Sequence, residues 1–318
     1  MNARSLGKHG PAVSVVGLGC NNFGGRLDLE ATRKVVHKAL DLGITLFDTA
    51  DVYGGYGYGN YGGSETQLGQ ILGARRKDIV LASKFGMAMN AAGTMKGASP
   101  SYIRSAIEAS LKRLRTDWID LYQIHRPDPQ TPIADTLGTL DELVKQGKVR
   151  AIGCSCFSSA QIDVAQEAAA RLGLAPLTTS QDEYSLLARD IERDPMPAIE
   201  RHGLGLLPYY PLANGLLTGK YKRNAPAPAG SRLAGGGMGG RYLNDPNWAI
   251  VEKLERFCAE RGKTLLQLAF GWLLAHDRVP SVIAGATKPE QLEQNVAAAA
   301  WTLSREEKDE VDRLTRRG

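Results

Sequence analysis

Residues 28–48 read DLEATRKVVHKALDLGITLFD and contain one helix followed by one strand. Apolar side chains between positions 29 and 40 recur at helical spacing, and Gly43 is typical of the residue that ends a helix. Thr45–Asp48 is short and apolar, as a buried strand is. The stretch therefore predicts a helix over 28–42 that leads directly into a strand.

The same alternation of strand and helix recurs along the whole chain. The expected strands are Val15–Gly19, Thr45–Asp48, Ile79–Ser83, Ile119–Ile124, Val149–Ser155, Leu177–Gln181, Leu204–Tyr209 and Ser281–Gly285. Most follow one another at intervals of roughly 30 residues, the length of a βα unit. Gly17-Leu18-Gly19 lacks the third glycine of a dinucleotide-binding fingerprint. We therefore expect one (β/α)8 TIM-barrel domain over residues 1–318 rather than an open doubly wound sheet.

Three additions to the barrel are expected. Arg4–Leu6 and Ala12–Ser14 flank a short turn, which predicts an N-terminal hairpin that closes the barrel floor. More than 70 residues separate the seventh strand from the eighth, enough for extra helices and a long loop. Ser304 and Glu307 have the spacing of a capping box, so a final helix should begin there.

Composition excludes several classes of protein. The net charge is +5 and the basic residues are scattered, so no nucleic-acid partner is expected. No run of 18 apolar residues and no signal peptide is present, which predicts a cytoplasmic protein without membrane association. The four cysteines form no C-x-x-C pair, so we expect reduced thiols and no metal site. Cys154 and Cys156 are two residues apart on one expected strand, so their side chains should point the same way. A monomer is the default expectation.

Four chemically active side chains follow three neighbouring strands. Asp48 ends the second strand, Tyr53 lies on the next loop, Lys84 follows the third strand and His125 follows the fourth. Each alone could be an ordinary cap or loop residue. Because strand ends of a barrel converge on one mouth, the four together predict an active site.

The four groups suit the reduction of a carbonyl. A phenol has a pKa near 10, and an ammonium about 4 Å away contributes roughly 4 kcal/mol at an effective dielectric of about 20, or about three pKa units. Lys84 is therefore expected to bring the pKa of Tyr53 towards neutrality, while Asp48 keeps the lysine charged. His125 would donate a hydrogen bond to the carbonyl oxygen. Such a site needs a hydride carrier beside it.

Eight stretches of the chain resemble the aldo-keto reductase superfamily, in order over about 290 residues. They are FDTADVYG (47–54), SETQLG (64–69), ASKFG (82–86), DLYQIH (120–125), GCSCFS (153–158), QDEYSLL (181–187), YYPLANGLLTGKY (209–221) and GATKPEQLEQNV (285–296). The resemblance places the family's catalytic tetrad on the four residues already selected. It implies reduction of an aldehyde or ketone by hydride transfer from a nicotinamide, with Tyr53 as the general acid.

The resemblance also implies a set of cofactor-binding residues. Ser155, Cys156 and Gln181 would lie at the carboxamide, and Tyr209 under the nicotinamide ring. The others are Pro211, Leu212, Asn214, Gly215, Lys220 and Arg232 at the pyrophosphate and Gly285, Thr287, Lys288, Gln291, Gln294 and Asn295 at the adenosine end.

The adenosine end has a physical argument of its own. The segment from Thr287 to Glu290 combines a helix cap, a proline and an early carboxylate, so a helix should begin there with free N–H groups that favour phosphate. Lys288 adds charge for a 2′-phosphate. NADPH is therefore expected in preference to NADH, although an ordinary capped surface helix has the same pattern.

The chain departs from the family pattern at three places. Cys156 stands where the family commonly has asparagine, and Cys20-Asn21 where it often has threonine and tryptophan. The segment 53–63 is longer than usual, and its Tyr56, Tyr58 and Tyr61 either wall the substrate mouth or pack the loop onto the barrel.

The sequence leaves two other functions open. One is a cofactor-binding regulatory subunit like the channel-associated members of the family, against which the intact His125 argues. The other is a Schiff-base aldolase that uses Lys84, against which the neighbouring Asp48 argues. The substrate does not follow from the sequence.

Overall fold

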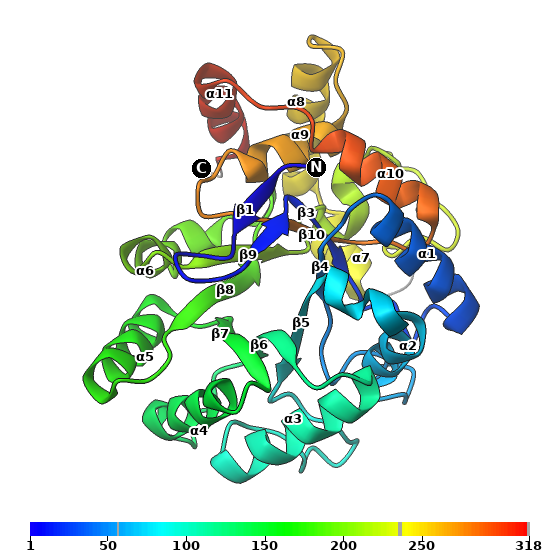
Figure 1. The fold of residues 1–318 in the computed structure, drawn as a ribbon. Coiled ribbons are helices and arrows are strands. Elements are labelled where there is room, and N and C mark those ends of the chain that lie inside the picture. The colour runs from blue at the N-terminus through cyan, green and yellow to red at the C-terminus, as the bar shows by residue number, and fades with distance from the viewer. Residues whose placement is uncertain (56, 235–236, 317–318) are drawn as a thin grey trace.

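The computed structural model describes residues 1–55, 57–234 and 237–316, and eight parallel strands form a barrel inside a ring of helices (Figure 1). Strand β10 pairs with β3, and pairing continues in chain order from β3 to β9, which lies beside β10. The strands are β3 (Val16–Gly19), β4 (Leu46–Asp48), β5 (Val80–Phe85), β6 (Ile119–Ile124), β7 (Val149–Ser155), β8 (Leu177–Glu183), β9 (Gly205–Tyr209) and β10 (Val282–Gly285). The expected TIM barrel is confirmed.

One α-helix of the ring follows each strand of the barrel, and further helices are added after β9. The ring helices are α1 (Leu29–Asp41), α2 (Gly63–Ile71), α3 (Pro100–Leu114), α4 (Ile133–Lys145), α5 (Ser159–Leu172), α6 (Met196–His202), α9 (Leu265–Leu274) and α10 (Pro289–Ala298). Their ends follow local chemistry, since the Asp28 and Ser158 side chains accept N-cap hydrogen bonds and Gly173 ends α5 in the left-handed region.

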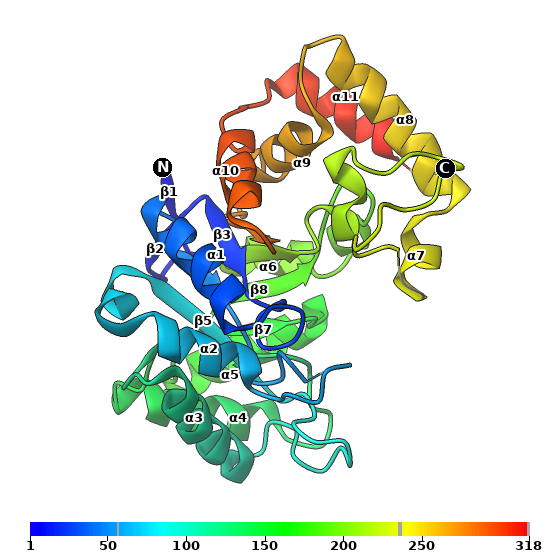
Figure 2. The same cartoon turned by 90° about the vertical axis from the view of Figure 1, so that its right-hand side faces the viewer.

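The additions expected from the sequence are present. Beyond the ring lie α7 (Gly237–Tyr242) and α8 (Asp245–Ala259), both between β9 and β10, and the C-terminal α11 (Arg305–Thr315), which packs beside α8 (Figure 2). Ser304 and Glu307 form the expected capping box. Short 3-10 helices occur at η1 (Gly73–Asp78), η2 (Asp190–Glu192) and η3 (Ala213–Thr218).

The N-terminal hairpin closes the floor of the barrel. Its strands β1 (Ala3–Ser5) and β2 (Ala12–Ser14) pair in antiparallel fashion. Leu6 and Val13 are fully buried and pack against inward-facing residues of the barrel. These barrel residues are Leu46, Ala82, Leu121, Ala151, Leu207 and Ile283. The hairpin therefore completes the lower layer of the interior.

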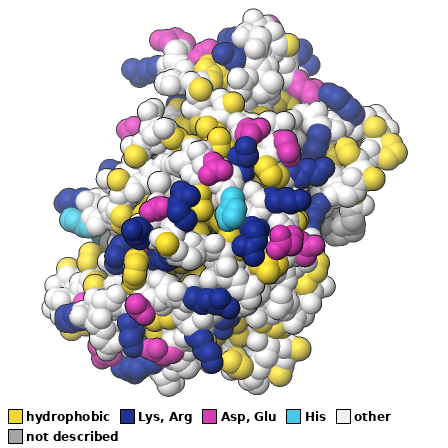
Figure 3. Space-filling model, turned by 45° about the vertical axis from the view of Figure 1, so that its right-hand side comes forward, with side chains coloured by type: hydrophobic (Ala, Val, Ile, Leu, Met, Phe, Trp, Pro, Cys, Tyr) yellow, Lys and Arg dark blue, Asp and Glu magenta, His cyan; other side chains and the backbone are white. Residues whose placement is uncertain are grey.

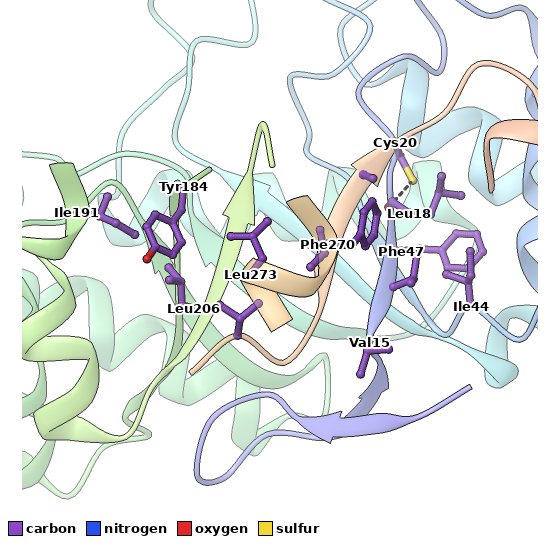
Figure 4. Close-up of a cluster of buried hydrophobic side chains, with 14 of the residues drawn as sticks. Val15, Leu18, Cys20, Ile44, Phe47, Tyr184, Ile191, Leu206, Phe270 and Leu273 are labelled. Carbon is purple, nitrogen blue, oxygen red and sulfur yellow. Dashed lines mark hydrogen bonds between the residues drawn. The ribbon is translucent and has the colours of Figure 1, made fainter. Parts of the chain in front are cut away.

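A second, larger apolar core fills the space between the strands and the helices. Figure 4 shows part of it, with Leu18, Ile44 and Phe47 at one end and Tyr184 and Leu206 at the other. All five side chains are at most 1% exposed.

Two expectations about strand ends were wrong. Strand β5 continues to Phe85, so Lys84 lies within the strand, where it is paired in register with Gln123. Strand β7 ends at Ser155, and Cys156 has a positive φ of 60°. Cys154 and Cys156 therefore do not share a strand face: Cys154 is buried, whereas Cys156 is partly exposed.

The surface carries mixed charges. On the face in Figure 3, Lys and Arg side chains are interspersed with Asp and Glu side chains. Within the described residues, no helix has the length and apolar character needed to cross a bilayer. No group of three or more His, Cys, Asp or Glu side chains suited to a metal ion occurs in that same part of the chain.

Replacing Leu6 by alanine tests the packing of the hairpin. Leu6 is fully buried, so the Leu6→Ala variant should lower the free energy of unfolding by about 2–5 kcal/mol in urea titrations. Val164→Ala is the control, because Val164 is 53% exposed and its loss should change the value by less than about 0.5 kcal/mol. Equal effects of the two substitutions would contradict the role of the hairpin.

Candidate active site

A cavity of about 930 Å³ opens at the carboxyl ends of the strands. Gly19, Asp48, Ser155, Tyr209 and Gly285, the last residues of β3, β4, β7, β9 and β10, all line it. Every residue predicted to be catalytic or to bind the cofactor also lines it except Lys84, which is fully buried beneath it. The structure therefore brings all of these predicted residues to one place, while their chemical roles stay predictions.

Lys84 and Asp48 form a buried ion pair at the base of the cavity. Lys84 Nζ lies 2.7 Å from Asp48 Oδ2, and it also donates to the Thr49 carbonyl oxygen at 2.8 Å and to the Tyr53 hydroxyl at 3.4 Å. Burial lowers the pKa of Lys84, but Asp48 and Tyr53 raise it by more, so the pKa lies above the ordinary value. A lysine held charged in this way is a poor nucleophile, which argues against the aldolase alternative.

Neighbouring strands hold the Asp48 carboxylate. Gln181 Nε2 donates to Asp48 Oδ1 at 2.9 Å, and the Gln181 carbonyl oxygen accepts a hydrogen bond from Ser155 Oγ at 2.8 Å. Gln123 Nε2 lies 3.5 Å from the same Asp48 oxygen. Strands β6, β7 and β8 are thus joined to the ion pair. Gln181 was expected to bind the carboxamide of the cofactor, but its side-chain N–H group already donates to Asp48.

The loop that carries Tyr53 is fixed by its own backbone. The Tyr53 amide donates to the Ala50 carbonyl, and the Ser64 amide donates to the Tyr53 carbonyl. Gly54 has a φ of 92°, and a Cβ at this position would lie 2.5 Å from the Asn60 carbonyl oxygen. Only glycine fits there. This tight turn brings the phenol back over β5.

Tyr53 does not have the lowered pKa that we expected from the sequence. Burial raises it most strongly and Asp48 raises it further, while Lys84 lowers it, so that the pKa rises to about 12. The expectation was wrong because it counted the charge of Lys84 but neither the loss of water nor the partial neutralisation by Asp48. The phenol is therefore protonated at neutral pH.

His125 completes the group at this end of the cavity. Its ring meets the Tyr53 ring edge to face, with the centroids 5.9 Å apart. Burial, and then the charges of Lys84 and Arg126, place its pKa well below the ordinary 6.5. The imidazole is therefore neutral at pH 7 and has one N–H to donate. Its Nδ1 is buried without a hydrogen-bond partner among the described residues.

The segment after β9 forms a loop suited to an anion. Tyr210, Ala213 and Asn214 have positive φ values, as does Gly215 at 97°. Successive residues in such conformations can form concave sites that bind anions through backbone N–H groups. A Cβ at Gly215 would lie 3.2 Å from Lys220 Nζ, so glycine lets the ammonium approach the backbone.

Arg232 carries a second charge to the same side of the cavity. It donates to Asn22 Oδ1 at 2.7 Å and to Asn21 Oδ1 and Asn214 Oδ1 at 3.4 Å. All three acceptors are neutral amides, and no carboxylate pairs with Arg232 in the described part of the chain. A largely buried guanidinium without an anionic partner fits a phosphate, so the donor set suits a dinucleotide.

The helix at the other end of the cavity begins one residue later than the sequence suggested. Lys288 is the N-cap of α10, which starts at Pro289. Gln291 Oε1 accepts hydrogen bonds from the amides of Thr287 at 2.7 Å and Lys288 at 3.3 Å. These two N–H groups are therefore not free, contrary to our expectation. Gln294, Asn295 and the exposed Lys288 line the cavity.

Cys156 occupies the cavity wall in a left-handed conformation. Its amide donates to Asp182 Oδ1 at 3.1 Å, and its Sγ lies 3.7 Å from the Tyr209 hydroxyl. Burial raises the pKa of Asp182 most strongly, against hydrogen bonds from Ser180 and Cys156, and brings it to about 6. The thiol thus faces the cavity where the family commonly has an amide.

The three tyrosines of segment 53–63 do not act alike. Tyr58 lines the cavity and is 59% exposed, as expected for a wall of the mouth. A Cβ at Gly55 would lie 2.2 Å from the Tyr61 ring, so Tyr61 packs within the loop. Tyr56 lies outside the described residues. Tyr58 therefore fits the expectation of a wall at the substrate mouth, and Tyr61 fits the expectation of packing within the loop.

Sequence reasoning missed several residues that line the cavity. Among them are Asn22, Arg26, Met87, Arg126 and Tyr210. Arg126 could have been found, because it directly follows His125 at a strand end. Arg26 had no such signal, since it lies in an irregular loop. In the structure it lines the cavity and donates a hydrogen bond to the Gly230 carbonyl.

Comparison with known proteins agrees with this geometry. The sequence model of the Aldo/keto reductase family matches residues 15–316. The chain is 37% identical over 309 residues to a probable voltage-gated potassium channel subunit beta of Arabidopsis thaliana, covering 94% of this chain and 91% of the relative. It is 33% identical over 322 residues to L-glyceraldehyde 3-phosphate reductase of Escherichia coli, covering 98% of this chain and 92% of the relative. It is 36% identical over 317 residues to probable aldo-keto reductase 1 of Glycine max, covering 96% of this chain and 86% of the relative. The chain belongs to the aldo/keto reductase family.

Proposed function

We propose that this protein is an NADPH-dependent reductase that converts an aldehyde or ketone into an alcohol. The single observation that carries the proposal is the position of a protonated phenol, a charged lysine and a neutral imidazole beside one large cavity. Lys84 Nζ is 3.4 Å from the Tyr53 hydroxyl, and the ring centroids of Tyr53 and His125 are 5.9 Å apart. Family membership supports an oxidoreductase acting on a small carbonyl compound.

The chemistry divides between the four residues. Tyr53 donates its proton to the carbonyl oxygen, and His125 donates a hydrogen bond to the same oxygen and orients it. Lys84 stabilises the phenolate that remains, and Asp48 keeps the ammonium charged in its buried position. NADPH, when bound, supplies the hydride.

The rest of the cavity supports binding of the dinucleotide. Lys220 and Arg232 would hold the pyrophosphate together with the backbone around Gly215, and Lys288 would bind the 2′-phosphate. Tyr209 and Cys156 would contact the nicotinamide end, with Ser155 and Gln181 beside them.

A regulatory role is the second candidate function. It is favoured by the name of the Arabidopsis thaliana relative, a probable channel subunit beta. Such a protein would bind NADPH without turning over aldehydes. The buried ion pair and the protonated Tyr53 support an enzyme instead. Tight binding of NADPH with no loss of its absorbance against a panel of aldehydes, ketones and sugars would favour regulation.

Replacing Tyr53 by phenylalanine removes the proposed acid and little else. Turnover of aldehydes should fall by about 10²–10⁴-fold, because general acid catalysis contributes that much. Binding of NADPH, followed by fluorescence, should stay intact. Tyr61→Phe is the matched control and should keep full turnover, since Tyr61 packs within the same loop. Full turnover in Tyr53→Phe would refute the assignment.

The pKa directions predict a flat pH profile for reduction. Tyr53, with a pKa of about 12, donates its proton only while protonated, so its activity is lost as pH rises towards that value. His125, with a pKa well below 6.5, stays neutral above that pH. The value of kcat/KM for aldehyde reduction should therefore be constant from pH 6 to 9. An inflection near pH 6.5 would contradict the neutral histidine.

Lys288 tests the choice of cofactor. Lys288→Ala should weaken NADPH binding by about 5- to 30-fold and leave NADH binding nearly unchanged, because only the former carries a 2′-phosphate. The figure is modest because the side chain is exposed. Lys288→Arg should keep the preference. An equal loss for both cofactors would show that Lys288 does not contact the 2′-phosphate.

A further inference from the structure

Arg126 is a cation at the catalytic end of the cavity that the mechanism does not use. It directly follows His125, lines the cavity and is exposed. Across residues 1–55, 57–234 and 237–316, no carboxylate forms an ion pair with its guanidinium, and no side chain or carbonyl group accepts a hydrogen bond from it. A guanidinium without a protein partner is open to a ligand.

The other cations of the cavity have assignments. Five Lys or Arg side chains line it, namely Arg26, Arg126, Lys220, Arg232 and Lys288. Lys220, Arg232 and Lys288 lie with the proposed cofactor phosphates, and Arg26 donates to the Gly230 carbonyl. Among the described lining residues Asp48 is the single carboxylate, and Lys84 already neutralises it. Arg126 therefore has no counter-ion within the site.

Asp182 is a carboxylate that could compete for Arg126, and it is already engaged. The charge of Arg126 is felt at Asp182, but the two side chains form no ion pair. Asp182 is 3% exposed and accepts hydrogen bonds from Ser180 Oγ at 2.6 Å and from the Cys156 amide at 3.1 Å. Cys156 lies between this carboxylate and the cavity. The guanidinium is thus left facing the space where a substrate would lie.

We propose that Arg126 binds a carboxylate or phosphate group of the substrate, so that the site prefers small anionic carbonyl compounds. A guanidinium presents paired N–H groups that match the oxygens of either anion. The anion would lie beside His125, with the carbonyl directed to Tyr53. This inference rests on the proposed reductase function and narrows it to a substrate class.

The test measures selectivity between charged and neutral aldehydes at saturating NADPH. Succinic semialdehyde is compared with its methyl ester, and glycolaldehyde phosphate with glycolaldehyde, so that the carboxylate and phosphate sources are separated. In Arg126→Met the ratio of kcat/KM, charged over neutral, should fall by about 5- to 50-fold for at least one pair. Arg126→Lys should keep part of the ratio, because it retains the charge but not the planar fork.

Arg193→Met is the matched control and should leave both ratios unchanged, since the Arg193 side chain is 89% exposed and does not line the cavity. If the unaltered protein reduces the neutral aldehydes but Arg126→Met keeps the ratio, the inference about Arg126 is wrong and the reductase function stands. The inference about Arg126 is also wrong if the unaltered protein prefers the neutral aldehyde of both pairs. Failure to reduce any aldehyde overturns the proposed function and this inference with it.

Discussion

The buried pair of Lys84 and Asp48 determines where the other groups of the site lie. Taking two charges out of water costs several kcal/mol per ion, and attraction offsets this only when geometry is good and the remaining donors and acceptors are satisfied. Here the Nζ to Oδ2 distance is 2.7 Å, the Thr49 carbonyl accepts a second hydrogen bond from the ammonium, and Gln181 donates to the other carboxylate oxygen. The third direction of the ammonium points to Tyr53. The ion pair connects β4 to β5, and the hydrogen bond from Gln181 connects β8 to both. The position of the Tyr53 hydroxyl therefore depends on the arrangement of these barrel strands.

The same pair explains why Tyr53 stays protonated. An isolated ammonium would favour the phenolate, but this one shares its charge with Asp48, and the phenol has lost much of its contact with water. Burial therefore outweighs the attraction, and the pKa rises to about 12. A proton donor in this state suits the reductive direction, in which the developing alkoxide takes up the proton. The neutral His125 adds a hydrogen bond without competing for that proton.

The sequence predicts the barrel and the membership of the site well, because both depend on periodicity. The carboxyl ends of the strands meet at one edge of a barrel, so the spacing of the strands along the sequence places Asp48 and His125 there. Lys84 also lies near that edge, although β5 extends one residue past it. Details that depend on competing local contacts could not be predicted. Gln291, in the first turn of α10, accepts hydrogen bonds from the Thr287 and Lys288 amides and thereby occupies both, and Cys156 leaves the strand through a left-handed conformation. Neither outcome has a signature in residue spacing.

Backbone strain is concentrated where the chemistry is expected. Six described non-glycine residues have positive φ, and three of them, Cys156, Tyr210 and Asn214, line the cavity. Such conformations cost of order 1 kcal/mol or more each and persist only where surrounding structure fixes them. The fixing contacts lie beside them, since the Cys156 amide donates to the Gln181 carbonyl at 3.2 Å and to Asp182 Oδ1 at 3.1 Å, and the Ala213 amide donates to the Tyr210 carbonyl at 2.9 Å. The strands that carry these residues are held by the hairpin layer at the floor and by the apolar core between strands and helices. A packed barrel therefore supports loops at the mouth that hold strained turns and cations without a carboxylate partner.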